Sequence, residues 1–465
     1  MAQISISALP RLIVGADTRV PTLNGPRRYV NFDNAASTPP FQPIVDTVNS
    51  FLEWYSNVHR GTGFKSQLSS WAFEEARDLV ARFVGADLNR EVVIFTKNTT
   101  EAINKLAGRA CGAPGDIILT TLMEHHSNEL PWRRAGRVVH VGLNPDGTID
   151  RADFESRLKQ YAGRVRLVAI TGASNVSGYI NDLGFFAARA HQAGAKIMVD
   201  GAQLVPHRPV NMNPDDPGRK IDFLVFSAHK MYAPYGVGVI VGEKECFEMG
   251  DPSEVGGGVV DIVTLEEAYW TDLPEKEEAG TPDIVGVVAL GAAIRLYQQL
   301  GWDNIIRHES ELTAHALERL KTIPGVTVYG SVDPRNASQR LGVISFNVNS
   351  VPHALTAAIL SYEGAIGVRA GCFCAHTYVK ELMGVTDAQA RKYELEILNR
   401  DRSHLPGAVR ASFGLYNTIE DVDWFATMVA KIATREYSAD YVLDKERGEY
   451  QPRDFVFKFD EYFRF

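Results

Sequence analysis

The sequence predicts an α/β protein with a large domain, built on a mostly parallel sheet flanked by helices, and a smaller C-terminal α+β domain. Three observations indicate this. The chain has 465 residues, whereas single hydrophobic cores stop growing near roughly 250–300 residues. Short apolar runs alternate with helical patterns through the first half, and a separate set of strand and helix patterns follows. We therefore expect an N-terminal arm over 1–30, a large domain over 31–295, a small domain over 296–440 and a tail over 441–465.

The large sheet is expected from seven β-rich runs that turn residues bound on both sides. Helical patterns such as residues 182–194 separate these runs, which favours parallel strands. Ligands of such sheets bind at the carboxyl ends of the strands, so the residues after each run are the candidates for chemistry. The runs cover residues 91–95, 116–120, 137–143, 165–170, 195–200, 222–226 and 237–242.

The remaining segments predict the small domain and the two chain ends. Three prolines break the first 30 residues, which are expected to be irregular. The aromatic and charged tail is compatible with a docked strand or with a segment that faces a partner. For the small domain we expect helices at 303–321 and 353–363 and strands at 326–330, 342–348 and 408–416.

Composition limits the classes of function. The net charge of −9 argues against wholesale binding to nucleic acid or to an anionic membrane. Four cysteines cannot form a disulfide framework in so long a chain, which indicates a reducing compartment. The chain has no signal-peptide pattern and no apolar run of membrane-spanning length. We expect a cytoplasmic enzyme without nucleic-acid or membrane partners.

Three strand ends carry polar groups with both a structural and a functional interpretation. Asn98, Thr99 and Thr100 follow the first run, where hydroxyls at a helix N-terminus either cap the helix or bind phosphate. His125 and the histidine after it are surface or core residues, or ligands of a bound group; no metal-ligand spacing lies nearby. Asn175 lies in a polar turn that turn chemistry alone would explain.

The next two strand ends indicate a particular cofactor. Asp200 closes an apolar strand, and a buried carboxylate there needs a partner such as a protonated ring nitrogen. Ser227, His229 and Lys230 follow the next strand. Lysine stems often cover apolar surface, but a lysine enclosed at a strand end is also suited to Schiff-base chemistry. A phosphate cradle, an imidazole, an acid and a lysine together match the needs of pyridoxal 5'-phosphate (PLP).

Several blocks of the sequence resemble those of a known family. Ordered blocks over about residues 30–430 include NFDNAAST, NTTEAIN, MEHHSN, SNVSG, VDGAQ, SAHKMYAPYGVG, EAGTPD, VRAGCFCA and RASFGLYNT. They resemble the class V aminotransferase-like, fold-type I PLP enzymes, and most closely the group II cysteine desulfurases. Relatives in the same group are selenocysteine lyases and the desulfurase domain of molybdenum-cofactor sulfurases.

The resemblance implies a role for each matching position. Lys230 would hold PLP covalently and move protons, and His125 would stack on the ring and take part in acid–base transfer. Arg410 would clamp the substrate carboxylate with help from Asn175, and Arg369 would lie beside it. The remaining cofactor-binding positions would be Thr99, Thr100, Asn175, Asp200, Gln203, Ser227 and His229, with Thr281 contributed by the second subunit of a homodimer.

The same resemblance places the nucleophile at Cys374, five residues after Arg369. Its thiolate would take sulfur from L-cysteine, release alanine and pass the persulfide sulfur to a protein or small-molecule acceptor. Cys372 would shield, resolve or relay the persulfide, or simply pack, and packing or a minor role is the favoured interpretation. A metal clip and a disulfide between the two cysteines are both disfavoured by their spacing.

Alternatives remain open from the sequence. A relative using the same PLP site as a selenocysteine or cysteine C–S lyase, an epimerase or an aminotransferase would share most of the motifs. A third hypothesis is a catalytically silent scaffold on the same fold. Two departures from the family pattern favour an unusual substrate or acceptor: an insert over 377–406, and an expanded stretch at 61–69.

Overall fold

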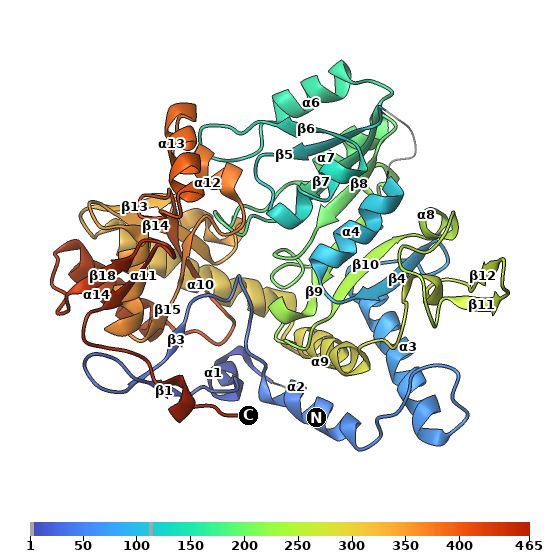
Figure 1. Cartoon of the computed structure of the whole chain (residues 1–465), viewed down its shortest axis with the longest axis horizontal. Helices are drawn as coiled ribbons and strands as arrows, with labels where there is room; N and C mark the ends of the chain where they lie inside the picture. Colours follow the sequence, from blue (N-terminus) through green and yellow to red (C-terminus); the bar gives the residue numbers. More distant parts are fainter. Residues whose placement is uncertain (1–3, 111–114) are drawn as a thin grey trace.

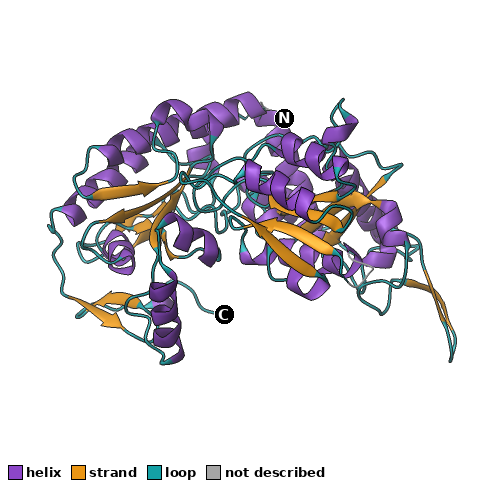
Figure 2. Ribbon diagram, turned by 90° about the horizontal axis from the view of Figure 1, so that it is seen from above, coloured by secondary structure: helices purple, strands orange, loops and turns teal. Residues whose placement is uncertain are grey.

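The computed structural model describes residues 4–110 and 115–465. Its two main sheets, of seven and four strands, lie toward opposite ends of the molecule with loops between them (Figure 2). The α/β fold class and the presence of both sheets are as predicted, whereas the exact domain boundaries stay a prediction.

All seven predicted runs form strands of one sheet, in the order β4-β10-β9-β8-β7-β5-β6. β10 is antiparallel to both of its neighbours, and the other strands run parallel. The carboxyl ends of the parallel strands therefore meet at one edge, where the predicted chemistry lies. The strands are β4 (Glu91–Thr96), β5 (Ile117–Thr121), β6 (Arg137–Val141), β7 (Val165–Thr171), β8 (Lys196–Asp200), β9 (Phe223–Ser227) and β10 (Gly238–Glu243).

Helices cover both faces of this sheet (Figure 1). Alternate residues of β4 show the consequence: Val93 and Phe95 belong to one core cluster, and Val92 and Ile94 to another, which α4 completes. Burial on both faces explains why the strands read as continuous apolar runs. The helices are α2 (Gln42–Leu52), α3 (Phe64–Val84), α4 (Thr99–Ala110), α5 (Trp132–Ala135), α6 (Arg151–Gln160), α7 (Leu183–Gln192), α8 (Lys244–Glu248) and α9 (Ile284–Leu300).

The small sheet has the antiparallel order β13-β14-β17-β16. Val30 and Phe32, close to the N-terminal arm, are buried in its core, and β3 (Val30–Asn31) pairs with β15 (Ile366–Gly367). The elements are β13 (Val326–Tyr329), β14 (Val343–Val348), β16 (Arg369–Gly371) and β17 (Ala408–Ser412), with α10 (Trp302–Lys321), α11 (His353–Tyr362) and α14 (Ile419–Ala433).

The segments that the family pattern left unexplained also form regular structure. The insert contains α12 (His376–Leu382) and α13 (Asp387–Leu398), and the tail begins with a hairpin of β18 (Tyr441–Asp444) and β19 (Glu449–Pro452). A further hairpin projects from the large domain (Figure 2); its strands are β11 (Val260–Val263) and β12 (Ala268–Trp270). The arm contains α1 (Leu9–Leu12), β1 (Arg19–Val20) and β2 (Arg27–Arg28).

Membrane-spanning helices were sought over the described residues. No single helix there has the length and apolar character needed to cross a bilayer, and one pair, α9 with α10, meets those criteria only when joined across a bend of 84°.

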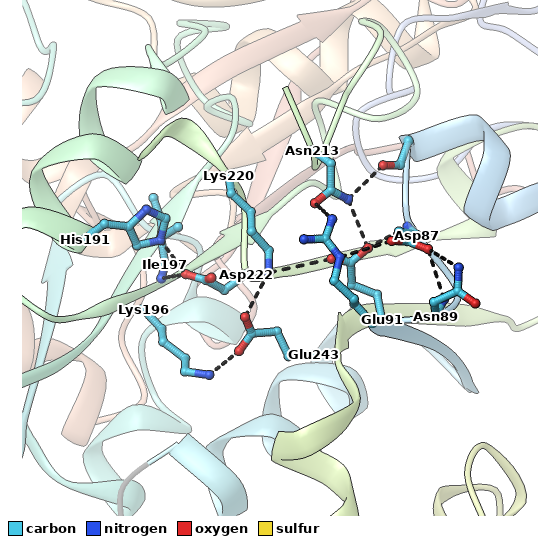
Figure 3. Close-up of polar contacts among 12 residues, drawn as sticks. Asp87, Asn89, Glu91, His191, Lys196, Ile197, Asn213, Lys220, Asp222 and Glu243 are labelled. Carbon is cyan, nitrogen blue, oxygen red and sulfur yellow. Dashed lines mark hydrogen bonds and ion pairs between the residues drawn. The ribbon is translucent and has the colours of Figure 1, made fainter. Parts of the chain in front are cut away.

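An ion-pair network lies at the sheet edge opposite the strand ends that carry the predicted chemistry (Figure 3). Lys220 lies between Glu243, at 2.9 Å, and Glu91, at 3.7 Å. The network joins the start of β4 to the end of β10 and closes the amino-terminal edge of the parallel strands. Its place in the fold indicates a structural role.

His191, at this edge of the sheet, gives a pH-dependent contribution to stability. Both ring nitrogens of His191 face acceptors, Nδ1 at 3.0 Å from the Gly218 carbonyl and Nε2 at 2.8 Å from Asp222. The hydrogen bond that the His191 ring donates to Asp222 raises the pKa of His191. Because the folded pKa is raised, the stabilisation is complete below the unfolded value of about 6.5 and is lost as pH rises through the folded pKa.

We therefore expect His191→Gln to lower the melting temperature by about 2 °C at acidic pH and by less at alkaline pH. Differential scanning fluorimetry of both proteins at about pH 5.5 and about pH 9 measures the difference. An equal loss at both pH values would contradict the assignment.

Candidate active site

A cavity of 280 Å³ lies where the carboxyl edge of the large sheet meets the small domain. β16, the loop after it and β17 contribute residues from the small domain, and the ends of β7, β8 and β9, the loops after β4, β5, β7, β8 and β9 and the segment after β3 contribute the rest. All predicted site residues except Thr281 line it: Thr99, Thr100, His125, Asn175, Asp200, Gln203, Ser227, His229, Lys230, Arg369, Cys374 and Arg410.

One end of the cavity is formed by the N-terminus of α4. The Ser227 hydroxyl accepts from the Thr99 backbone N–H at 2.8 Å and lies 2.6 Å from the Thr99 hydroxyl, and Thr100 pairs with Ser127 at 2.7 Å. Gly238 allows this packing, because a Cβ there would approach the backbone of residue 98 to 2.3 Å. Hydroxyls gathered at a helix N-terminus suit an anionic group such as a phosphate.

The middle of the cavity holds a buried acid and a buried amide. Asp200 accepts from the Ala202 N–H at 3.0 Å, and burial raises its pKa. Gln203 donates to the Ala35 carbonyl at 2.7 Å, while its buried Oε1 has no partner among the described residues. Burial also raises the pKa of Glu124, which interacts with Asp200, to about 8. Among the described residues Asp200 forms no ion pair and Gln203 Oε1 accepts no hydrogen bond, so a ligand with a cation and a donor suits both groups.

Lys230 follows β9 in a short 3-10 turn and lines the same cavity. Burial lowers the pKa of its amine to about 8, although the charge of Asp200 acts in the opposite direction. No hydrogen bond or ion pair from its Nζ is found within the described chain. A lysine with a lowered pKa, free to react, suits covalent attachment to a carbonyl group.

Burial lowers the pKa of His125 to about 3, with a further contribution from the charge of Lys230. The ring is therefore neutral at physiological pH. Its Nδ1 accepts from the Ser127 N–H at 3.1 Å, which assigns the ring proton to Nε2. His229 is likewise neutral, because burial lowers its pKa to about 4.

Arg410 crosses the cavity from β17 and is buried. Its Nη2 lies 2.8 Å from Asp33, and its Nη1 donates to the Asn175 carbonyl at 3.1 Å. Arg369 approaches the other oxygen of Asp33, at 3.7 Å. The buried Nε of Arg410 has no partner in the described chain. Asp33 thus holds the guanidinium in place where an incoming carboxylate would have to share it or displace it.

The loop of residues 371–376, called the nucleophile loop below, brings Cys374 to this cavity. Hydrogen bonds fasten it: Asn175 Nδ2 donates to the Phe373 carbonyl at 2.9 Å, and the His126 N–H donates to the Cys374 carbonyl at 2.7 Å. Phe373 and Cys374 both adopt left-handed backbone angles, with φ of 52° and 54°. Such consecutive strained residues mark a functional loop. The Cys374 side chain is exposed and free.

Cys372 differs from Cys374 in its exposure and in its hydrogen bonding. Its thiol is partly buried and donates to the Pro406 carbonyl at 3.1 Å. Burial raises its pKa to about 11, so it is protonated at neutral pH. This environment favours a packing role.

Serine in place of Cys372 keeps a donor for the Pro406 carbonyl. We therefore expect Cys372→Ser to retain alanine formation from L-cysteine to within about twofold of the wild-type rate, because the raised thiol pKa excludes it as the attacking group. Steady-state assays measure this. A loss of more than about tenfold would show that the thiol itself takes part.

The structure adds residues that sequence reasoning did not select. Ser127 and Phe373 line the cavity, Asp33 pairs with Arg410 of its lining, and Glu124 interacts with Asp200. Asp33, Ser127 and Glu124 belong to the blocks NFDNAAST and MEHHSN, so the signal was present. The arginine–carboxylate pair across the cavity had no local signal, because its members are 377 residues apart in the chain.

Thr281 is exposed and lines a different cavity, with Thr96, Lys97 and Asp283. It does not reach the predicted site of its own chain. Its assignment to the site of a second subunit stays a prediction.

The sequence of this chain is similar to those of known proteins. The profile of the family "Aminotransferase class-V" matches residues 30–425. A probable cysteine desulfurase of Halalkalibacterium halodurans is 38% identical over 88% of this chain and 93% of its own. A cysteine desulfurase of Haloferax volcanii is 35% identical over 85% and 87%. The chain belongs to the class V aminotransferase family.

Solved structures of this family agree with the fold. The apo cysteine desulfurase of Thermococcus onnurineus superposes with a TM-score of 0.79, at 32% identity, over 92% of this chain and 98% of its own. A cysteine desulfurase of Escherichia coli gives 0.73 at 30% identity, over 88% and 96%. Class V aminotransferases are PLP-dependent enzymes, and the cavity fits that cofactor. Among the described residues Asp200 and the Lys230 amine form no ion pair and Gln203 Oε1 accepts no hydrogen bond, as is needed for groups that would bind the ring nitrogen, the aldehyde and the ring hydroxyl of PLP.

Proposed function

We propose that this protein is a PLP-dependent cysteine desulfurase, which converts L-cysteine to L-alanine and leaves a persulfide on Cys374 for an acceptor. One observation carries the proposal: the free thiol of Cys374 lines the same 280 Å³ cavity as Lys230 and Arg410. Family members that act as aminotransferases or epimerases need no thiol at this place. Its presence therefore favours sulfur chemistry over the other reactions of the family.

Different residues of the cavity would bind different parts of PLP. Thr99, Thr100, Ser227 and His229 would hold the phosphate, and Asp200 and Gln203 the ring nitrogen and ring hydroxyl. Lys230 would hold the cofactor covalently. When bound, PLP supplies an electron sink that weakens bonds at the α and β carbons of an amino acid. A pyridinium beside Asp200 would restore the charged form of a carboxyl that burial alone disfavours.

The protein's own groups supply binding and proton transfer. Arg410 would bind the carboxylate of L-cysteine through its unpartnered Nε, with Asp33 keeping the guanidinium in position. A pKa of about 8 lets Lys230 both accept and donate a proton near neutral pH. Neutral His125 carries its proton on Nε2 and is suited to donate it.

The sulfur step needs no external oxidant. The Cys374 thiolate attacks the sulfur of the bound cysteine, so an S–S bond forms on Cys374 while the Cβ–S bond of the substrate breaks. The Cβ then takes up a proton and becomes the methyl group of alanine. Atoms and electrons balance, since one cysteine and one thiol give one alanine and one persulfide.

We also propose that the enzyme acts as a homodimer in the cytoplasm. Thr281 is exposed and remote from the site of its own chain, as expected of a residue that completes a partner's site. The projecting β11–β12 hairpin exposes Ile262, Val263 and Leu265, apolar side chains that an interface would cover. Light scattering after size-exclusion chromatography tests the dimer, and a monomeric mass would overturn it.

Incubation of the PLP-loaded protein with L-cysteine and dithiothreitol tests the function. We expect equal amounts of alanine and sulfide, and without dithiothreitol a peptide containing Cys374 that is heavier by one sulfur atom. Formation of pyruvate and ammonia, of D-cysteine, or of alanine without a sulfur adduct would instead support another reaction of the family.

A further inference from the structure

A second cavity, of 460 Å³, shares a wall with the active site. That wall is the nucleophile loop. Phe373 and Cys374 line the active-site cavity, whereas Gly371, Cys372 and His376 line the second one. His376 is exposed and lies only two residues beyond the exposed Cys374. A sulfur atom carried on Cys374 therefore lies on a loop that also borders the second cavity.

The insert and the tail build this cavity together. α12, α13 and the chain through Pro406 supply one side, α11 another, and residues 447–451 of the β18–β19 hairpin a third. Arg402 N–H donates to the Lys445 carbonyl at 2.8 Å, so the insert and the hairpin are directly joined. The hairpin lies beyond residue 425, where the match to the family ends.

The lining has the composition of a site for a small organic molecule. A volume of 460 Å³ falls within the range of about 300–1,000 Å³ that such sites have. Tyr362, Tyr393 and Tyr450 offer aromatic surface, next to the side chains of small and aliphatic residues such as Ala357 and Ala390.

Charges at the lining favour an acidic group on that molecule. Three cationic side chains, Lys380, Arg402 and Arg447, face two carboxylates, Glu394 and Glu449. Arg447 forms only a loose ion pair, at 3.9 Å, with a residue of its own turn. Lys380 is partly buried beside the nucleophile loop, and no ion pair of its ammonium is found within the described chain. A carboxylate on the ligand would give this ammonium a partner.

We propose that the second cavity binds the sulfur acceptor, a small organic thiol with an aromatic or apolar body and a carboxylate. This rests on the proposed desulfurase function and adds the chemical class of the acceptor to it. The acceptor thiolate attacks the outer sulfur of the Cys374 persulfide. A new S–S bond forms on the acceptor, the S–S bond to Cys374 breaks, and Cys374 leaves as a thiolate that is ready for the next substrate.

The test uses thiosalicylate, an aromatic thiol acid, as the probe and dithiothreitol as an acceptor that needs no site. Ala390→Trp places an indole in the second cavity, and Ala388→Trp places the same group on the exposed part of the same helix as a matched control. Alanine formation by the PLP-loaded enzyme is measured against the concentration of each thiol, and thiosalicylate binding is measured by calorimetry.

For the wild type and Ala388→Trp we expect saturation by thiosalicylate. For Ala390→Trp we expect a loss of about tenfold or more in its affinity and in kcat/KM, with an unchanged rate in dithiothreitol. Lys380→Met should weaken thiosalicylate but not thiophenol, which lacks the carboxylate. A wild type that is not saturated by thiosalicylate, or equal behaviour of the two tryptophan variants, would overturn this proposal. Absence of alanine in dithiothreitol would instead overturn the desulfurase function.

Discussion

Replacing Lys230 with alanine is expected to abolish alanine formation from L-cysteine, with a loss of roughly a thousandfold or more. Lys230 is unpaired among the described residues, and it lines the cavity whose other residues are proposed to bind the phosphate, ring nitrogen and ring hydroxyl of PLP. Its amine is also the group whose pKa, about 8, suits proton transfer near neutral pH. Under the proposed function, this one substitution removes both the covalent attachment of the cofactor and the main proton carrier.

Visible absorption spectra and steady-state assays test this expectation. The absorbance of the lysine-bound cofactor should vanish in Lys230→Ala and persist in Lys392→Ala, which changes an exposed lysine of α13. A circular dichroism spectrum like that of the wild type would show that the variant is folded. Retained cofactor absorbance or retained turnover would contradict the assignment of Lys230.

Replacing Cys374 with serine is the second expected large effect. A serine hydroxyl is not ionised at neutral pH and is a poor nucleophile toward sulfur, so alanine formation should fall by about a hundredfold or more. Cofactor absorbance should remain, because Lys230, Asp200 and the phosphate-binding residues are unchanged. The loss should fall on kcat rather than on substrate binding, since Arg410 and Asp33 are also unchanged.

Cys372→Ser is the matched control for this variant, because it makes the same chemical change two residues away on the same loop. Its thiol has a raised pKa and faces the second cavity, so the two variants should differ by well over tenfold. Equal losses in both would show that the two sulfur atoms act together. Full-rate alanine formation by Cys374→Ser would overturn the persulfide mechanism.

Much of the site could be predicted from the sequence because strand ends follow a simple rule. Thr99, His125, Asp200 and Lys230 each follow an apolar run, and parallel strands bring such positions to one edge of the sheet. The rule needs only the strand pattern, and all seven runs formed strands. The resemblance to the class V aminotransferases then gave each of these residues a proposed role.

What the sequence could not supply are contacts between distant segments. Arg410 pairs with Asp33, 377 residues earlier, and no periodicity connects the two. The insert and the tail read separately as a charged helical segment and an aromatic end, yet they fold into one cavity beside the nucleophile loop. Long-range packing of this kind leaves no local pattern, because each segment contributes only one wall.

The two cysteines separate what the sequence predicted from what the tertiary structure decided. The resemblance to the family, through the spacing from Arg369, predicted from the sequence that Cys374 is the nucleophile, and a packing or minor role was favoured for Cys372. Only the tertiary structure decided that they line different cavities. The physical reason is the backbone of the loop, left-handed at Phe373 and Cys374, which directs one sulfur toward Lys230 and leaves the other against the insert.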